Sequence, residues 1–227
     1  VLPVLKEMNS MIGMDNIKET MTDLTLFHLQ GLDAMNKHML HTIIDGPPGS
    51  GKSTVVKILA KFFSRLGFLE SDEVVYLTRS QLVGKYLGHT ASQTEEIFKK
   101  AFGKVLVFDE LYSLGNPEGK DSFAKEAIDT ITMCLDKYAE DIIFIGCGYK
   151  DEINQSFMSY NPGLERRFTV RLSTQAPTPE GLNKIYKKLV NEDEWSFSTD
   201  FEPSNDFFEE RKLAFLFNGG DIETLYQ

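Results

Sequence analysis

Gly46-Pro47-Pro48-Gly49-Ser50-Gly51-Lys52-Ser53 is the stretch that decides the fold of this chain. It lies between an apolar run, 40–44, and a helical pattern, 52–63, which are the flanks that a phosphate-binding loop requires. Its glycines allow backbone conformations that are closed to other residues, so successive N–H groups can turn inward around phosphate groups. The positive end of the following helix adds attraction for the same anion.

The end of this loop supplies the charged chemistry. Lys52 is expected to reach the β and γ phosphates of a nucleoside triphosphate as a point charge, and the Ser53 hydroxyl is expected to ligate Mg²⁺. ATP and Mg²⁺ are therefore the predicted ligands. The residues expected to bind ATP are those of the loop and the one after it: Pro47, Pro48, Gly49, Ser50, Gly51, Lys52, Ser53 and Thr54.

Apolar runs recur along the chain as they do in a parallel sheet that is buried on both faces. They are short, rich in branched residues and bounded by turn formers. They cover 40–44, 74–77, 105–108 and 142–145, and a final short strand fits 168–172. Helical patterns alternate with them at 16–29, 52–63, 92–102 and 122–138. The alternation predicts an α/β fold of the P-loop NTPase class, with a five-stranded parallel sheet flanked by helices.

The ends of two helices can be predicted from local signals. Asp15 or Asn16 is expected to cap the helix that precedes the first strand. Thr178 followed by Pro179 predicts the start of a helix after the last strand. The composition also changes there, so we expect a nucleotide-binding α/β part over 1–173 and a small C-terminal helical lid over 174–227. The lid is expected to be truncated, because the chain begins without a methionine and ends inside a helical pattern.

Charge and composition argue against several classes of protein. The 24 Lys and Arg residues against 34 Asp and Glu give a formal net charge of −10, so the long-range field repels nucleic acid and anionic membranes. No apolar stretch approaches the ~20 residues that span a bilayer and no signal peptide is visible, so an intracellular, cytoplasmic protein is expected. Cys134 and Cys147 lack metal-site spacing and are interpreted as packing residues. Residues 191–210 combine acidic and aromatic side chains, which is typical either of a solvated segment with buried rings or of a docking surface for a basic partner.

Two carboxylates, Asp109 and Glu110, follow the apolar run 105–108 directly. Open α/β sheets bind their ligands at the carboxyl ends of their strands, where these residues are expected to lie. Asp109 is expected to hold the Mg²⁺ ion. Glu110 is expected to orient and deprotonate the water that attacks the γ phosphate. The sequence therefore predicts ATP hydrolysis.

Taken with Asn-Pro-Gly-Leu-Glu-Arg-Arg-Phe at 161–168, these motifs resemble those of the AAA+ ATPases. Residues 82–94, Leu-Val-Gly-Lys-Tyr-Leu-Gly-His-Thr-Ala-Ser-Gln-Thr, are similar to the branch that contains red-type Rubisco activases and stage V sporulation protein K-like ATPases. The resemblance runs from about Met11 to nearly the end of the chain. It implies a homo-oligomeric ring, expected to be a hexamer, in which ATP hydrolysis remodels or threads a protein substrate through a central pore.

The resemblance also implies roles for individual positions in the nucleotide site. Ile12 and Gly13 match the segment that lies beside the adenine. Tyr149 matches the sensor residue between the phosphate loop and the acidic strand, a place where Asn or Thr is commoner. Arg167 matches the arginine finger that reaches into the neighbouring subunit's nucleotide, with Arg166 as the second candidate. For these arginines the alternative is a surface ion pair with Glu165 or with a neighbouring residue.

The resemblance further matches Tyr86 and Leu87 to the first pore loop. An aromatic ring there offers large, rigid contact area to any passing polypeptide at low entropic cost. The alternative is that Tyr86 simply packs within a loop.

One departure concerns the lid. Many AAA+ proteins carry an arginine near the start of a late lid helix, whereas the matching residues 217–222 hold none and include Asp221, which repels a polyanion. A scaffold that binds nucleotide without turnover is therefore one alternative function. A DNA-directed motor is disfavoured by the acidic charge and the aromatic pore loop. A small-molecule kinase usually has an arginine-rich lid that closes over its substrates. This class is disfavoured because Arg211 is the sole arginine after Pro177.

Overall fold

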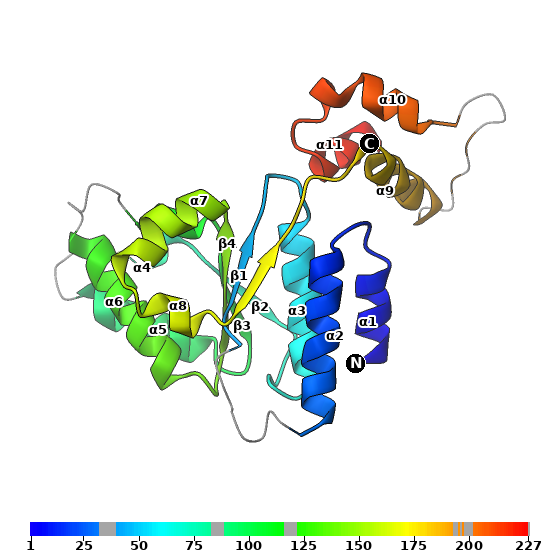
Figure 1. Cartoon of the computed structure of the whole chain (residues 1–227). Helices are drawn as coiled ribbons and strands as arrows, with labels where there is room; N and C mark the ends of the chain where they lie inside the picture. Colours follow the sequence, from blue (N-terminus) through cyan, green and yellow to red (C-terminus); the bar gives the residue numbers. More distant parts are fainter. Residues whose placement is uncertain are drawn as a thin grey trace.

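The computed structural model describes residues 1–31, 40–82, 89–115, 122–192, 195, 197 and 202–226. Its strands form one parallel sheet in the order β2-β3-β4-β1-β5 (Figure 1). They are β1 (Thr42–Asp45), β2 (Val74–Leu77), β3 (Val105–Phe108), β4 (Ile143–Gly148) and β5 (Val170–Ser173). The predicted five-stranded parallel α/β fold is confirmed. The pore-loop residues Tyr86 and Leu87 lie outside the described residues.

Helices cover both faces of the sheet, and a group of C-terminal helices lies beyond one end of it (Figure 1). One face is covered by α1 (Leu2–Asn9), α2 (Asp15–Leu29) and α3 (Lys52–Arg65). The opposite face is covered by α4 (Arg79–Leu82), α5 (His89–Lys100), η2 (Leu111–Leu114), α6 (Ser122–Lys137), α7 (Lys150–Glu152), η3 (Ile153–Phe157), η4 (Met158–Tyr160) and α8 (Leu164–Arg167). The C-terminal group consists of α9 (Pro179–Glu192), α10 (Asn205–Glu210), η5 (Lys212–Ala214) and α11 (Gly219–Tyr226).

The strands send alternate side chains into two hydrophobic cores, because successive residues of a strand point to opposite faces. Ile44 packs with α1, α2 and α3, whereas its neighbour Ile43 packs with α5 and α6. In the second core the rings of Phe98 and Phe144 stack with their centres 5.9 Å apart. Burial on both faces explains why the inner strand β3 reads as a continuous apolar run.

The start of α2 differs from the sequence-based expectation. The helix begins at Asp15, directly after Met14, whose φ of 62° lies in the left-handed region. No side chain caps this end, so the predicted cap by Asp15 or Asn16 is wrong. Asn16 instead donates from Nδ2 to the backbone carbonyl of Ser173 at 3.0 Å, which ties α2 to the end of β5.

The C-terminal helices have a small hydrophobic cluster of their own, built from Leu182, Phe208 and Ile222. Thr178 caps α9 as predicted, because its Oγ1 accepts a hydrogen bond from the N–H of Gly181 at 3.1 Å. The boundary between a nucleotide-binding part and a lid, placed after residue 173, stays a prediction.

The acidic stretch 191–210 holds rings in two environments. Phe208 is fully buried at the centre of the C-terminal cluster, whereas Trp195 exposes 71% of its surface. Buried rings therefore account for part of the aromatic content, and the docking surface for a basic partner stays a hypothesis.

Cys134 and Cys147 are both buried and free. Within the described ranges, no helix combines the length and the apolar character that crossing a membrane requires.

His41 lies directly before β1, and hydrogen bonds of its ring link this strand to β4 and α6. The side chain is fully buried, its Nδ1 accepts from the N–H of Phe144 at 3.0 Å, and its Nε2 lies 3.0 Å from the carbonyl oxygen of Leu135. A carbonyl oxygen can only accept, so Nε2 carries the proton and the ring is neutral. Burial lowers the pKa of His41 to about 4, against the opposing effects of the Leu135 carbonyl and the Asp136 charge.

This buried histidine predicts a pH-dependent loss of stability. Between pH 6.5 and about 4 the unfolded chain takes up a proton that folded His41 does not, so the free energy of unfolding falls as the pH falls through this window. The loss is on the order of 3 kcal/mol. Replacement His41→Gln keeps an amide donor toward Leu135 and should remove about one proton from the pH slope. Denaturant titrations at several pH values measure this slope, and equal slopes in the two proteins would contradict the assignment.

Candidate nucleotide-binding site

The loop between β1 and α3 is shaped by close main-chain contacts. Gly49 and Gly51 have φ values of +64° and +88°, in the left-handed region that favours glycine. A Cβ atom on Gly49 would lie 1.6 Å from the carbonyl oxygen of Phe217, so no other residue fits there. The N–H of Gly46 donates to the carbonyl of Gly148 at the end of β4, at 3.1 Å. The loop is therefore held by the sheet on one side and by the C-terminal helices on the other.

Ser50 is the buried polar residue of this loop. Its Oγ donates to the Pro47 carbonyl at 2.7 Å and lies 2.6 Å from Oγ1 of Thr174, directly after β5. Thr174 is itself buried and also contacts the Asp45 carbonyl at 3.2 Å. Sequence reasoning missed Thr174, because it belongs to no motif and lies far from the loop along the chain.

Lys52 begins α3 and folds its side chain back over the loop. Its Nζ donates to the carbonyl oxygens of Gly46 and Pro47, each at 2.8 Å, and lies 5.5 Å from the centre of the Tyr149 ring. Burial lowers the pKa of Lys52, while nearby negative groups that include Asp109 act to raise it. These closest partners of the ammonium group are uncharged, so its positive charge remains available for an anion at this loop.

Asp109 and Glu110 follow β3 at the same edge of the sheet as the loop, because β1, β4 and β3 are parallel. Glu110 has a φ of 55°, an uncommon conformation for a residue other than glycine. Its N–H donates to Oδ1 of Asp109 at 3.1 Å. Backbone strain of this kind is concentrated at functional sites, which makes this sharp turn a candidate catalytic feature.

Tyr149 follows β4, the strand between β1 and β3. The structure therefore brings it close to Lys52, and its ring also stacks on Tyr112 with the centres 5.6 Å apart. Burial raises the pKa of Tyr112 to about 12, and the charge of Glu110 adds to this effect. Tyr112 consequently keeps its proton beside Glu110. Sequence reasoning missed this residue, which lies in a short turn without a recognisable motif.

Ser53 and Asp109, the predicted Mg²⁺ ligands, come from α3 and from the end of β3. Ser53 and the adjacent Thr54 are exposed in the first turn of α3. Among the described residues, no group of three or more His, Cys, Asp or Glu could enclose a metal ion. One hydroxyl and one carboxylate fit an ion that takes its remaining oxygens from phosphate groups and water, as Mg²⁺ does. The donor set therefore fits Mg²⁺ bound together with a triphosphate.

The segment ahead of α2 lies between the phosphate loop and α9. The side chain of Ile12 is 3.6 Å from the position that a Cβ on Gly181 would take, and the side chain of Met14 is 2.8 Å from the corresponding position on Gly51. Gly13, between them, is exposed and has a φ of +71°. Met14 therefore lies beside the phosphate loop and Ile12 beside α9, and the place of Ile12 and Gly13 next to the adenine stays a prediction.

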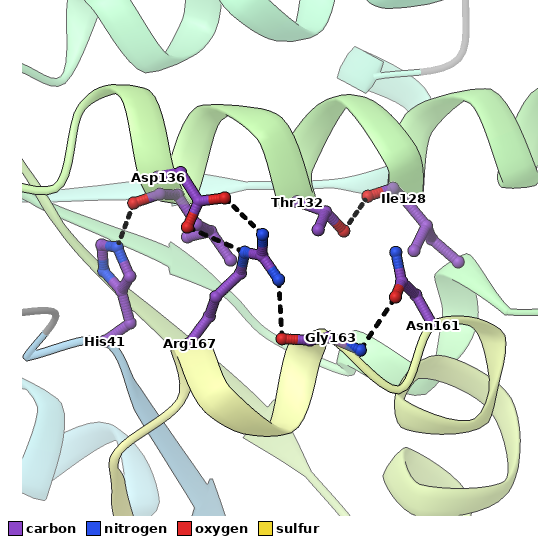
Figure 2. A network of polar contacts seen from close by, with 8 residues as sticks. His41, Ile128, Thr132, Asp136, Asn161, Gly163 and Arg167 are labelled. Atoms are coloured by element: carbon purple, nitrogen blue, oxygen red, sulfur yellow. Dashed lines mark hydrogen bonds and ion pairs between the residues drawn. The ribbon is translucent and has the colours of Figure 1, made fainter.

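The two arginines at the end of α8 lie in different environments, and Figure 2 shows the contacts of Arg167. Arg167 holds both carboxylate oxygens of Asp136, with Nε at 2.9 Å from Oδ1, and donates to the Gly163 carbonyl at 2.7 Å. Its side chain is only 19% exposed. Arg166 is exposed. An ion pair within the subunit, the alternative considered above, is therefore present for Arg167, but its partner is Asp136 on α6, and Glu165 lies 4.0 Å from Arg171 instead.

Comparison with known proteins identifies the family. The family described as "ATPase family associated with various cellular activities (AAA)" matches residues 42–173, more than half of the chain. The cfxQ-like protein R730 of Acanthamoeba polyphaga mimivirus is 40% identical over 222 residues, which are 97% of this chain and 55% of that protein. Stage V sporulation protein K of Bacillus subtilis (strain 168) is 34% identical over 204 residues, 87% of this chain and 62% of that protein.

A third relative is a ribulose bisphosphate carboxylase/oxygenase activase, chloroplastic, from Cyanidioschyzon merolae, which is 32% identical over 199 residues, 85% of this chain and 67% of that protein. The chain spans about half to two-thirds of the length of these relatives. Both the fold and the relatives agree with the motifs. The chain belongs to the AAA family of ATPases, in the branch that contains stage V sporulation protein K and the red-type Rubisco activases.

Proposed function

We propose that the chain is the Mg²⁺-dependent ATP-hydrolysing module of a cytoplasmic ring, a homohexamer, that remodels a protein substrate by threading it through a central pore. The observation that carries the hydrolytic part is the grouping of Lys52, Tyr149, Asp109 and Glu110 around one glycine-rich loop. The net charge of −10 supports a protein substrate over nucleic acid or a membrane surface. One relative is named for activating ribulose bisphosphate carboxylase/oxygenase, and the proposal for this chain stops at a protein.

In this mechanism the loop binds the triphosphate through main-chain N–H groups and through Lys52. The Lys52 ammonium exchanges two neutral carbonyl partners for phosphate oxygens, which form stronger, charge-assisted hydrogen bonds. Ile12 and Gly13 lie beside the adenine. Tyr149 stays near Lys52 and senses the terminal phosphate.

Glu110 acts as the general base. Its carboxylate accepts a proton from the attacking water and orients that water toward the γ phosphorus. Ser53 and Asp109 hold the Mg²⁺ ion, which when bound neutralises charge on the phosphate oxygens. Tyr112, protonated beside Glu110, helps to fix the direction of that carboxylate.

An arginine of the neighbouring subunit completes the site. A planar guanidinium neutralises charge that spreads over the γ oxygens as the bond breaks. Arg167 is the first candidate and Arg166 the second. Arg167 is held by Asp136 and Gly163, which fixes its position on the surface of its own subunit, whereas Arg166 is exposed and can reach outward.

The assignment of the base is tested by Glu110→Gln, which keeps the shape and removes the proton acceptor. We expect this variant to bind ATP with near-normal affinity and to lose about 100-fold or more in turnover. Lys52→Ala should instead weaken ATP binding itself. Fluorescent-nucleotide titration and steady-state phosphate release separate the two effects. Normal hydrolysis by Glu110→Gln would refute the role of Glu110, and absence of hydrolysis in the wild type would favour the scaffold.

The arginine assignment is tested with a matched control. Arg167→Ala should lower turnover by about 1000-fold and also lower the melting temperature, since it removes the partner of Asp136. Asp136→Asn breaks the same ion pair but leaves the guanidinium, so it should lower the melting temperature while retaining most of the turnover. Equal loss of turnover in both variants would mean that Arg167 is structural. Arg166→Ala is then the variant expected to stop hydrolysis.

Sharing of the site between subunits has its own test. Mixing inactive Glu110→Gln and Arg167→Ala subunits should restore part of the hydrolysis, because some interfaces then combine an intact base with an intact arginine. No recovery at any mixing ratio would argue against a site formed by two subunits.

The threading proposal concerns Tyr86 and Leu87. Tyr86→Ala should leave basal hydrolysis within about twofold of the wild type and stop remodelling of a protein substrate. The reason is that the aromatic side chain of Tyr86 contacts the polypeptide and not the nucleotide. Tyr86→Phe, which retains the aromatic ring, is the control. Remodelling by Tyr86→Ala at the wild-type rate would exclude threading through this residue.

A further inference from the structure

The start of α11 touches the phosphate loop through main-chain atoms of that loop. Nδ2 of Asn218 donates to the carbonyl of Pro48 at 3.0 Å, and the N–H of Gly219 donates to the carbonyl of Gly49 at 3.0 Å. The carbonyl of Phe217 lies so close to Gly49 that a Cβ there would be 1.6 Å away. This is the stretch in which many AAA+ proteins carry an arginine and this chain carries none.

The geometry of the peptide group links these contacts to phosphate binding. A trans peptide is planar, so its N–H points opposite to its C=O. Asn218 and Gly219 hold the carbonyls of Pro48 and Gly49 toward α11, and therefore the N–H groups of Gly49 and Ser50 point away from it. Within the described part of the chain neither N–H has a hydrogen-bond partner. Loop amides of this kind are the donors that bind phosphate.

We infer that Asn218 is a positioning residue, which acts through the Pro48 and Gly49 peptides to aim loop amides at the phosphates of a bound nucleotide. The inference rests on the proposed function of this site. In this chain α11 thus acts on the nucleotide through the backbone of the loop, by neutral hydrogen bonds, in place of a charged side chain.

Local structure explains why asparagine suits this task. Asn218 has a φ of 51°, a left-handed conformation that asparagine tolerates better than most residues. Three positions later Asp221 accepts from the N–H of Phe217 at 2.6 Å, which fixes the turn, and Ile222 anchors the helix in the buried C-terminal cluster. The structural role of Asp221 is therefore to stabilise this turn, which accounts for a negative charge close to the expected nucleotide site.

The test compares the affinities of ATP, ADP and adenosine in the wild type, Asn218→Gly and Asn218→Asp. Glycine keeps the left-handed backbone and removes the donor, while aspartate keeps the shape and places an acceptor against the Pro48 carbonyl. Glu223→Gln, an exposed change one turn further along α11, is the control. We expect ATP and ADP to bind about 3- to 10-fold more weakly to Asn218→Gly and more weakly still to Asn218→Asp, with adenosine affinity unchanged. The KM for ATP should rise more than kcat falls.

A second measurement reads the loop directly. In nucleotide-free protein labelled with ¹⁵N, the amide signals of Gly49 and Ser50 should shift in Asn218→Gly and stay in place in Glu223→Gln. A purely structural role would weaken adenosine and ATP alike, which would overturn the inference. So would unchanged or tighter ATP binding by Asn218→Gly, since the contact would then be neutral or would obstruct the loop. If the wild type bound no ATP, the proposed function itself would fail. If the wild type bound ATP and Asn218→Gly bound it equally well, only the inference about Asn218 would fail.

Discussion

Main chain packs against main chain at the loop between β1 and α3, and the arrangement of the site depends on this contact. The loop is confined by the Gly148 carbonyl of β4, by the Thr174 carbonyl after β5 and by the Phe217 carbonyl ahead of α11. Glycine is needed where backbones approach this closely, because any side chain would occupy the same space. Lys52 starts the helix that follows, so its reach is set by the shape of the loop.

The fold could be predicted from the sequence because burial on both faces of the sheet leaves a direct trace in the chain. Strand β3 and the first half of β4 carry buried apolar residues without interruption, and the alternation of such runs with helices then implies parallel pairing. The ends of elements were harder. Helix α5 begins at His89, ahead of the predicted Ser92, since its first turn lacks apolar periodicity. The left-handed Met14, which replaces a side-chain cap on α2, has no signal in residue type.

For the candidate site, residues within motifs could be named from the sequence, and residues that support those motifs could not. The phosphate loop and the acidic pair each occupy consecutive positions, so spacing alone identifies them. The contact of Ser50 with Thr174 joins residues 124 apart, and that of Pro48 with Asn218 joins residues 170 apart. Arg167 meets Asp136 across 31 residues. Such contacts depend on how whole elements pack, and no local pattern encodes them.

The bond between Asn218 and Pro48 also has a thermodynamic consequence. Linkage is reciprocal. If docking of the C-terminal helices on the loop changes the free energy of nucleotide binding, then nucleotide binding changes the free energy of that docking by the same amount. A partner that binds α11, such as a neighbouring subunit, then changes the affinity for nucleotide, and bound nucleotide changes the affinity for that partner. One uncharged amide would thus suffice to make the occupancy of a single loop felt at a distance.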